Sequence, residues 1–163
     1  MNRHFQTPLA LAFYNGHARG RWLDRVIARH DRGRFAGPFS HVELVFNLDH
    51  GPVCFSSSFR DGGVRLKRID LDSKWTTVEL VAGRAEAERL RQWCRTKLGG
   101  RYDLPGVLAF KLPWVRPKLN WWFCSEICSA AVQRLRHCPP ALRHHRPEDV
   151  SPNKLFHLCT ETP

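Results

Sequence analysis

A cysteine stands at the point where an aromatic stretch of the sequence gives way to a helical pattern. In WWFCSEICSAAVQRL (residues 121–135), apolar residues recur at helical spacing after Cys124, so Cys124 is predicted to lie in the first turn of a helix. A thiol at a helix N-terminus faces unpaired backbone N–H groups and the positive end of the helix dipole, and both favour the thiolate. The same N–H groups can hold an oxyanion. This position therefore suits a nucleophile.

A cysteine nucleophile needs a base, and nine histidines are candidates. Only His41 combines a strand setting with polar neighbours, because His41, Glu43 and Val45 fall on one face of the strand predicted at FSHVELVF (39–46). A strand histidine facing a cysteine at a helix start is the arrangement of the papain-type dyad. The alternative is that Cys124 is a buried packing residue and His41 an ordinary strand residue.

The pattern along the rest of the chain predicts the elements that position these two side chains. Apolar and β-branched runs broken by turn residues predict five strands, at 9–16, 40–47, 52–58, 63–69 and 74–81. Helical periodicity predicts further helices at 21–30 and from 83 to about Leu98. Residues 102–120 are expected to form an ordered loop, and the proline-rich segment at about 139–163 an irregular tail. Together these elements predict one α+β domain over residues 1–163, with a central antiparallel sheet packed against the helix of Cys124.

Composition limits the classes of function. The 163 residues are 42% hydrophobic, which is enough for one core. A formal charge of +11 favours contact with nucleic acid, anionic lipid or an acidic polymer, without choosing among them. No signal peptide and no run of about 20 apolar residues is recognisable, so no transmembrane segment is expected. The six cysteines lack the spacing of a disulfide framework, and a cytoplasmic protein with reduced thiols is expected.

Several short motifs resemble those of one enzyme family. PFSHVELVF, YDLPGVL and WFCSEICSAAV are similar to segments of the permuted NlpC-type, YiiX-like papain-fold amidases, relatives of the lecithin:retinol acyltransferase group. That family places the strand histidine before the helical cysteine, and here His41 precedes Cys124 by 83 positions (124 − 41). The likeness covers about residues 9–156 in layout, and AFYNG, SHVEL and SSSFRDGGVR also resemble members encoded by bacteriophages and prophages. It implies a permuted papain-like fold.

The resemblance also implies roles for individual residues. Cys124 would be the nucleophile, and His41 the general base and then the acid that protonates the leaving group. Tyr102 would donate a hydrogen bond to the developing oxyanion or to substrate, and its alternative is a core tyrosine. Ser125 and Glu126 follow the family's Cys-Ser-Glu pattern and are expected to serve the helix start, with Ser125 also a candidate for substrate contact. Neither a metal nor a cofactor is implied.

The residue that orients the imidazole is where the sequence departs from the family pattern. Many relatives have glycine two positions after the histidine and a polar residue on the next strand, whereas this chain has Glu43 there and only Ser56, Ser57 and Ser58 on the next strand. Glu43 is favoured because a carboxylate adds a charge that a hydroxyl lacks, and Ser56 is the fallback and a candidate for substrate contact. Against Glu43, residues two apart on a strand lie about 7 Å from each other, so its carboxylate has to bend back. Its other options are to bind substrate or to pair with an arginine.

These residues predict a cysteine hydrolase that cleaves an amide or a related acyl bond through an acyl-enzyme. Among peptide-type substrates, peptidoglycan in a bacterial host is the first candidate. The enzymatic alternative is acyl transfer or hydrolysis on lipid or thioester substrates, since the same dyad serves each of these reactions.

Two hypotheses of other classes stay open. One is a non-enzymatic basic module that binds nucleic acid or an anionic surface, although no recognised nucleic-acid motif is present. The other is a zinc site, although Cys-x3-Cys on a helix lacks the turn-borne Cys-x2-Cys arrangement of structural zinc sites. Its candidate ligands are Cys124, Cys128, His137, Cys138, His144, His145, His157 and Cys159.

Overall fold

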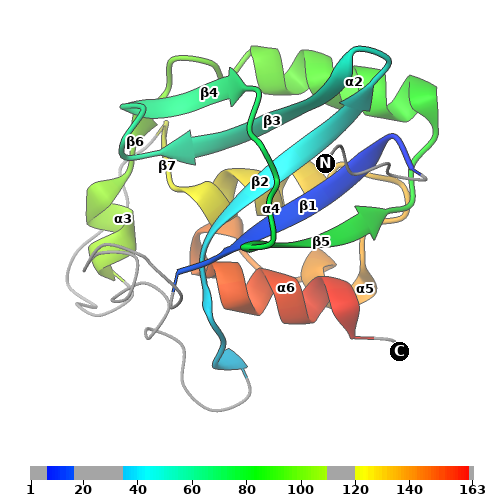
Figure 1. The fold of residues 1–163 in the computed structure, drawn as a ribbon. Coiled ribbons are helices and arrows are strands. Elements are labelled where there is room, and N and C mark those ends of the chain that lie inside the picture. The colour runs from blue at the N-terminus through cyan, green and yellow to red at the C-terminus, as the bar shows by residue number, and fades with distance from the viewer. Residues whose placement is uncertain (1–6, 17–34, 110–119, 162–163) are drawn as a thin grey trace.

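The structure, a computed structural model, describes residues 7–16, 35–109 and 120–161 (Figure 1). Its strands are β1 (Leu9–Asn15), β2 (Phe39–Leu48), β3 (Gly51–Ser58), β4 (Gly63–Lys67), β5 (Trp75–Leu80), β6 (Arg101–Tyr102) and β7 (Trp121–Trp122). Its helices are α2 (Arg84–Arg95), α3 (Leu104–Ala109), α4 (Cys124–Val132), α5 (Pro140–Arg143), the 3₁₀ turn η2 (Pro147–Asp149) and α6 (Pro152–Thr160). The fold is therefore a mixed α+β structure.

The strands form one sheet in the order β5-β1-β2-β3-β4-β6-β7. Neighbours from β5 to β6 pair antiparallel, whereas β6 and β7 pair parallel. The meander β2-β3-β4 has short turns, as expected from the turn residues NLDHGP and RDGG. The five predicted strands are confirmed as β1 to β5, although β4 ends at Lys67, two residues earlier than predicted.

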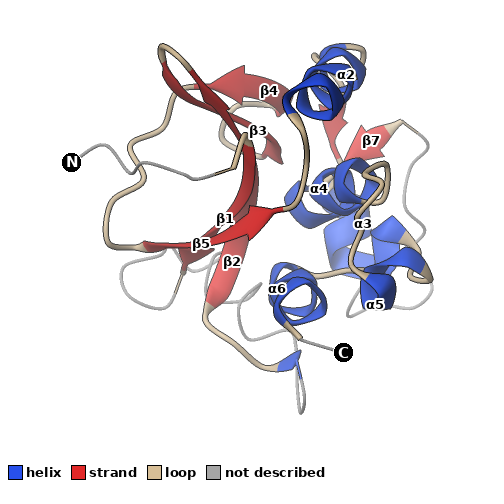
Figure 2. Cartoon of the chain, turned by 90° about the vertical axis from the view of Figure 1, so that its right-hand side faces the viewer, coloured by secondary structure: helices blue, strands red, loops and turns tan. Residues whose placement is uncertain are grey.

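The two faces of the sheet carry separate apolar clusters, because alternate residues of a strand point to opposite sides. On one face, Val42, Leu44 and Phe46 of β2 belong to the larger core, and α4 and α6 contact this strand. Figure 2 shows the helices gathered on that side of the sheet. On the other face, Val45 packs with Leu71 of the β4–β5 connection, which crosses the front of the sheet in Figure 1. Helix α4 is consequently the central helix, buried on nearly all sides.

The helical predictions require corrections. Helix α2 confirms the helix predicted from residue 83, but it ends at Arg95 and continues as turns to Gly99. The helix predicted at 21–30 lies outside the described residues. The expected loop at 102–120 contains β6 and α3, where the Asp103 carboxylate accepts a hydrogen bond from the Gly106 N–H at 2.9 Å. This carboxylate closes the first turn of α3.

The expectation of an irregular tail from residue 139 is also wrong, because the prolines there begin helices. Pro140, Pro147 and Pro152 each stand at the start of a helical segment, where a missing N–H removes no intrahelical hydrogen bond. Ser151 caps α6 by accepting from the Lys154 N–H at 3.1 Å. Leu155 is fully buried in the larger core, so α6 forms part of the layer that supports the sheet.

Candidate active site

Helix α4 begins at Cys124, as the sequence pattern predicted. The residue before it, Phe123, is extended (φ −102°, ψ 170°), and its backbone N–H donates to Glu126 Oε2 at 3.2 Å. The Ser57 hydroxyl donates to the Trp122 carbonyl oxygen at 2.6 Å, which ties the approach to the helix to β3. Cys124 is therefore held in the first turn, beside the unpaired N–H groups of a helix N-terminus.

On β2, the Glu43 carboxylate bends back toward His41. His41 Nε2 and Glu43 Oε1 are 2.6 Å apart, although the two residues are two positions apart on one strand. Arg65 on β4 explains this conformation, since its Nη1 and Nη2 donate to Glu43 Oε2 and Oε1 at 2.6 and 2.5 Å. Arg65 Nε also donates to Asp61 Oδ2 at 2.9 Å. Glu43 is fully buried, and both of its oxygens are thus engaged by cationic groups.

Beyond the contacts of Glu43 with His41 and with Arg65, a third contact joins His41 to Cys124, the candidate nucleophile. The Cys124 side chain acts on the His41 imidazole through its charge and a hydrogen bond, and both raise the pKa of the imidazole. The contact lies beyond the last paired residues of β2 and β3, Leu44 and Phe55. The strands part at this point, and a histidine of β2 can meet a residue of α4. The sequence-predicted trio Cys124, His41 and Glu43 is therefore brought together.

The electrostatics of the site favour a protonated imidazole. Burial alone would lower the pKa of His41, but the Cys124 thiolate and the Glu43 carboxylate beside the ring raise it to about 10. Burial alone would raise the pKa of Glu43, but the charge of His41 and the hydrogen bonds from Arg65 hold it below its usual range. At neutral pH, an imidazolium accordingly lies between a carboxylate and the cysteine.

Burial dominates the environment of the other cysteines described next. Burial raises the pKa of Cys54, Cys94 and Cys159 to about 12, and burial also raises the pKa of Cys128 well above its ordinary value. Cys128 packs one helical turn beyond Cys124 and points at backbone carbonyls of β2 and β3. These thiols stay protonated and behave as small apolar groups.

A cavity of about 810 Å³ lies beside His41. Tyr102 and Ser40 line it together with His41 and Glu43. Trp75 also lines it and lies edge-on to the imidazole, with ring centroids 6.3 Å apart. Cys124 is only 4% exposed and is not among the described lining residues, whereas its partner His41 is. Substrate bound here would approach the dyad from the imidazole side.

Comparison with known proteins leaves this site without a relative. No protein-family model, no curated protein and no solved structure matches the chain. The resemblance drawn from the sequence motifs therefore stays a prediction.

The remaining predicted residues have different surroundings from those of the trio. Tyr102 lies on β6 next to Trp122 of β7, two residues before Cys124, and its ring packs against Phe59 at 5.7 Å. Ser56 does not orient the imidazole, because its hydroxyl donates to the Val42 carbonyl oxygen at 2.7 Å, where β2 and β3 part. Ser125 is fully buried and does not cap α4. Its role in substrate contact stays a prediction.

Sequence reasoning missed two groups of this site. Arg65 is the last residue of the segment SSSFRDGGVR, but nothing in the spacing indicated that β4 would bring it to Glu43. Ser40 is 2% exposed, and among the residues that the structure describes its hydroxyl finds no hydrogen-bond partner. Its place next to His41 in the sequence was the available signal. A buried polar group without a partner at a cavity wall is suited to a ligand.

The zinc hypothesis finds no support in the described ranges. Over 7–16, 35–109 and 120–161, no three His, Cys, Asp or Glu side chains are grouped to hold a metal ion. The eight candidate ligands all lie within these ranges.

None of the described helices has the length and apolar character needed to cross a membrane.

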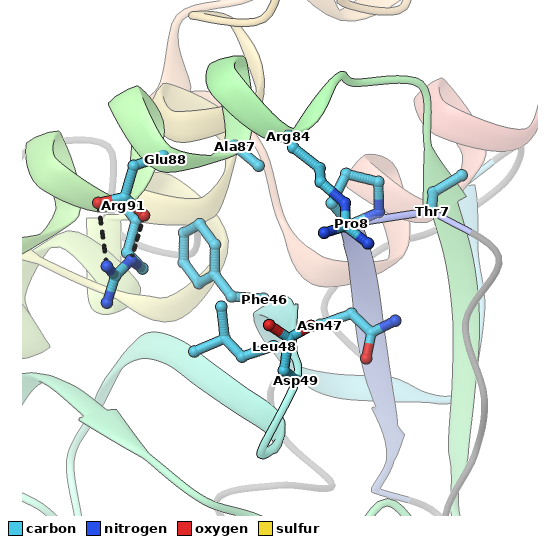
Figure 3. Close-up of a pocket in the computed structure, with 10 residues that line it drawn as sticks. All are labelled: Thr7, Pro8, Phe46, Asn47, Leu48, Asp49, Arg84, Ala87, Glu88 and Arg91. Atoms are coloured by element: carbon cyan, nitrogen blue, oxygen red, sulfur yellow. Dashed lines mark hydrogen bonds and ion pairs between the residues drawn. The ribbon is translucent and has the colours of Figure 1, made fainter.

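A second cavity, of about 350 Å³, lies at the opposite end of β2 (Figure 3). It is bounded by the end of β2 and by helix α2, which contributes Arg84 and the ion pair between Arg91 and Glu88. It contains neither a cysteine nor a histidine among its described lining residues. We therefore assign the candidate chemistry to the cavity beside His41.

Proposed function

We propose that this protein is a cysteine hydrolase of permuted papain-like architecture that acts on an amide or a related acyl bond. The observation that carries the proposal is the hydrogen-bonded chain from Cys124 through His41 to Glu43, with Cys124 in the first turn of α4. The chain order of histidine strand before cysteine helix supports the permuted architecture. Arg65 takes no part in bond making but holds the Glu43 carboxylate toward the imidazole.

In the first step, the thiolate of Cys124 attacks the carbonyl carbon of the substrate. The new S–C bond converts the carbonyl oxygen to an oxyanion, which the N–H groups at the start of α4 are placed to hold, with Tyr102 as a further donor. His41, protonated at neutral pH, gives its proton to the leaving amine as the C–N bond breaks. The products are a thioester on Cys124 and a neutral imidazole.

In the second step, His41 is the base. It takes a proton from a water molecule whose oxygen attacks the thioester carbonyl, and the C–S bond breaks to release the acid and return the thiolate and imidazolium. If an amine or alcohol replaces water, the same residues carry out acyl transfer. Hydrolysis and transfer thus differ in the acceptor and not in the dyad.

The non-enzymatic alternative accounts for less of the arrangement. A basic binding module needs only exposed cations. It gives no reason for the carboxylate of Glu43, which is fully buried and directed at a histidine that contacts a cysteine. Burying a carboxylate requires compensation from partners, which Arg65 and His41 supply. A buried acid that orients a dyad is typical of an active site.

The test is alkylation of the native protein with a limiting amount of iodoacetamide across pH, with mass-spectrometric mapping of all six cysteines. Cys124 is expected to react first below pH 7, because an imidazolium next to it stabilises its thiolate. Cys54, Cys94 and Cys159 serve as internal references, since their pKa of about 12 keeps them protonated. In His41→Ala the preference for Cys124 should disappear. Equal reactivity of Cys124 and the reference thiols in the wild type would refute the proposal.

A further inference from the structure

The hydroxyl of Ser40 is a polar group of the cavity that the proposed chemistry leaves unused. Ser40 is 2% exposed and lines the cavity together with His41. Among the described residues, its hydroxyl oxygen has no hydrogen-bond partner. A buried hydroxyl without a partner lowers the stability of the folded protein, so its presence requires an explanation. A ligand in the cavity can supply the missing partner.

A register shift at the start of β2 sets the position of Ser40. Tyr14 of β1 is opposite His41, whereas the next residue of β1 is opposite Phe39. Ser40 is thus an additional residue of β2, with no position opposite it on β1. Consecutive residues of a regular strand point to opposite faces, yet Ser40 and His41 line one cavity. An additional residue bends a strand and redirects a side chain, and such bulges are frequent next to active sites.

Helix α4 is oriented so that its first turn lies near Ser40. The Cys128 sulfur is 3.8 Å from the Val42 carbonyl oxygen, and Cys124, one helical turn earlier, acts on His41. A step back along α4 therefore corresponds to a step back along β2, and the residue before His41 is Ser40. Consecutive Cα atoms are about 3.8 Å apart. Ser40 consequently lies beside the dyad, at the end of α4 where the helix begins.

The first turn of α4 has donors to offer in the same place. The residue before the helix is Phe123, whose side chain has no oxygen that could accept from the helix N–H groups. The position that usually supplies a capping oxygen therefore leaves these N–H groups open. Together with the Ser40 hydroxyl they form a set of donors beside the Cys124 thiol. Donors gathered at a helix start are suited to a negatively charged oxygen.

We propose that Ser40 is a catalytic residue, whose hydroxyl donates a hydrogen bond to the oxyanion that forms when Cys124 attacks the substrate carbonyl. The proposal rests on the proposed function, because this oxyanion forms only if Cys124 is a nucleophile. A hydrogen bond to a charged oxygen is stronger than one to a neutral carbonyl, so Ser40 stabilises the transition state more than the bound substrate. Ser40 keeps its proton and forms no covalent bond. The electron pair on the oxyanion re-forms the C=O bond when the leaving group departs.

Two reactions of Cys124 separate this role from others. Acylation by p-nitrophenyl acetate passes through a tetrahedral oxyanion and then expels p-nitrophenolate, whereas alkylation by iodoacetamide displaces iodide and forms no oxyanion. The measurements are the rates of both reactions at Cys124, followed by p-nitrophenolate release and by mass-spectrometric mapping of the modified cysteine. The ester carries no N–H, so a hydroxyl that only accepted a hydrogen bond from a substrate amide would not affect its rate.

In Ser40→Ala, acylation of Cys124 is expected to be about 10- to 100-fold slower, because the loss of one oxyanion donor typically costs a hundredfold or more in rate with a full substrate. The rate of alkylation and its dependence on pH should change by less than about twofold, since a contact made only to the oxyanion leaves the thiolate unaffected. The urea midpoint of unfolding should equal or exceed that of the wild type, because an unsatisfied buried hydroxyl is removed.

Ser129→Ala is the matched control. Ser129 is fully buried, and its hydroxyl also has no hydrogen-bond partner among the described residues. It lies on α4 but does not belong to the described lining of the cavity beside His41. Ser129→Ala should therefore keep the wild-type rates of both acylation and alkylation. A selective loss of acylation in this control as well would overturn the assignment to Ser40.

Failure of the inference differs from failure of the proposed function. If wild-type Cys124 reacts readily with iodoacetamide below pH 7 but Ser40→Ala acylates at the wild-type rate, Ser40 is not an oxyanion donor and the dyad stands. The same conclusion follows if Ser40→Ala slows both reactions equally, or if its urea midpoint falls, because the hydroxyl would then act within the fold. If Cys124 has no enhanced reactivity toward iodoacetamide, or if His41→Ala acylates as fast as the wild type, the proposed function fails and the inference fails with it.

Discussion

Replacing Glu43 by Gln is expected to lower the pKa of His41 from about 10 to about 8.5. The carboxylate oxygen lies 2.6 Å from Nε2, which puts the two charge centres about 4 Å apart, a separation at which unit charges near a protein surface interact by about 4 kcal/mol. Because Arg65 shares the carboxylate and the amide keeps one hydrogen bond, about half of this energy should be lost. At 1.36 kcal/mol per pKa unit, roughly 1.5 units follow.

The assay is an NMR titration of the His41 ring from mildly acidic to strongly alkaline pH, with the His41 signal identified by its absence from His41→Ala. This assignment is needed because the protein has nine histidines, each with its own ring signals. Thermal unfolding gives a second readout with a defined sign. A histidine whose pKa is raised on folding stabilises the protein fully below about pH 6.5, and the stabilisation declines as the pH rises to about 10. In Glu43→Gln this decline should end near pH 8.5.

Two results would refute this reasoning. One is a wild-type His41 that titrates near 6.5, the ordinary value for histidine, because neither neighbour would then act on the ring. The other is an unchanged midpoint in Glu43→Gln, which would mean that the carboxylate orients the imidazole without charging it. Asp49→Asn is the control, since Asp49 lies at the far end of β2 beside the second cavity. In this variant the titration midpoint of His41 should equal that of the wild type.

Two further predictions concern stability. Burial, with the charges of Asp103 and Glu148, raises the pKa of Glu126 to about 8. The folded protein is therefore expected to lose stability as the pH rises from about 4.5 through 8. In Glu126→Gln, the urea midpoint of unfolding should fall less across this pH range. A Cβ at Gly63 (φ +149°) would meet the Gly100 carbonyl oxygen at 2.0 Å, so Gly63→Ala should lose more than about 1 kcal/mol in urea unfolding. Gly62→Ala (φ +80°), with open space around its Cβ, is the matched control and should lose less; an equal loss would contradict the steric argument.

The parts of the fold that could be predicted are those set by local pattern. The strands β2 to β4 follow from alternation and from turn residues that lie next to one another in the chain, so no distant contact is needed to find them. The prolines of the last third misled the prediction, because proline breaks a helix in its interior but is favoured at the first position of a helix. Only the capping hydroxyl of Ser151 and the buried Leu155 distinguish a helix start from an irregular segment.

The candidate site likewise has features that follow from local sequence pattern and features that depend on distant contacts. Alternation placed His41 and Glu43 on one face, and helical spacing placed Cys124 at a helix start, both from neighbouring residues. The favoured role of Glu43 required its carboxylate to bend back, but the group that holds it there could not be predicted, because Arg65 is 22 positions away and two strands across. The contact of His41 with Cys124 likewise depends on where β2 and β3 stop pairing. Spacing along the chain does not report such distances.

The position of Arg65 on the same meander as His41 and Glu43 has a consequence for the order of folding. The pairing of Glu43 with Arg65 closes a loop of 22 residues within β2-β3-β4, whereas the contact of His41 with Cys124 spans 83 positions (124 − 41) and requires α4 to dock. Closing the longer loop costs about 1 kcal/mol more in chain entropy, and short-range contacts form earlier. We therefore expect His41, Glu43 and Arg65 to come together before Cys124 docks beside them, so the proposed site is completed only when the last third of the chain has folded.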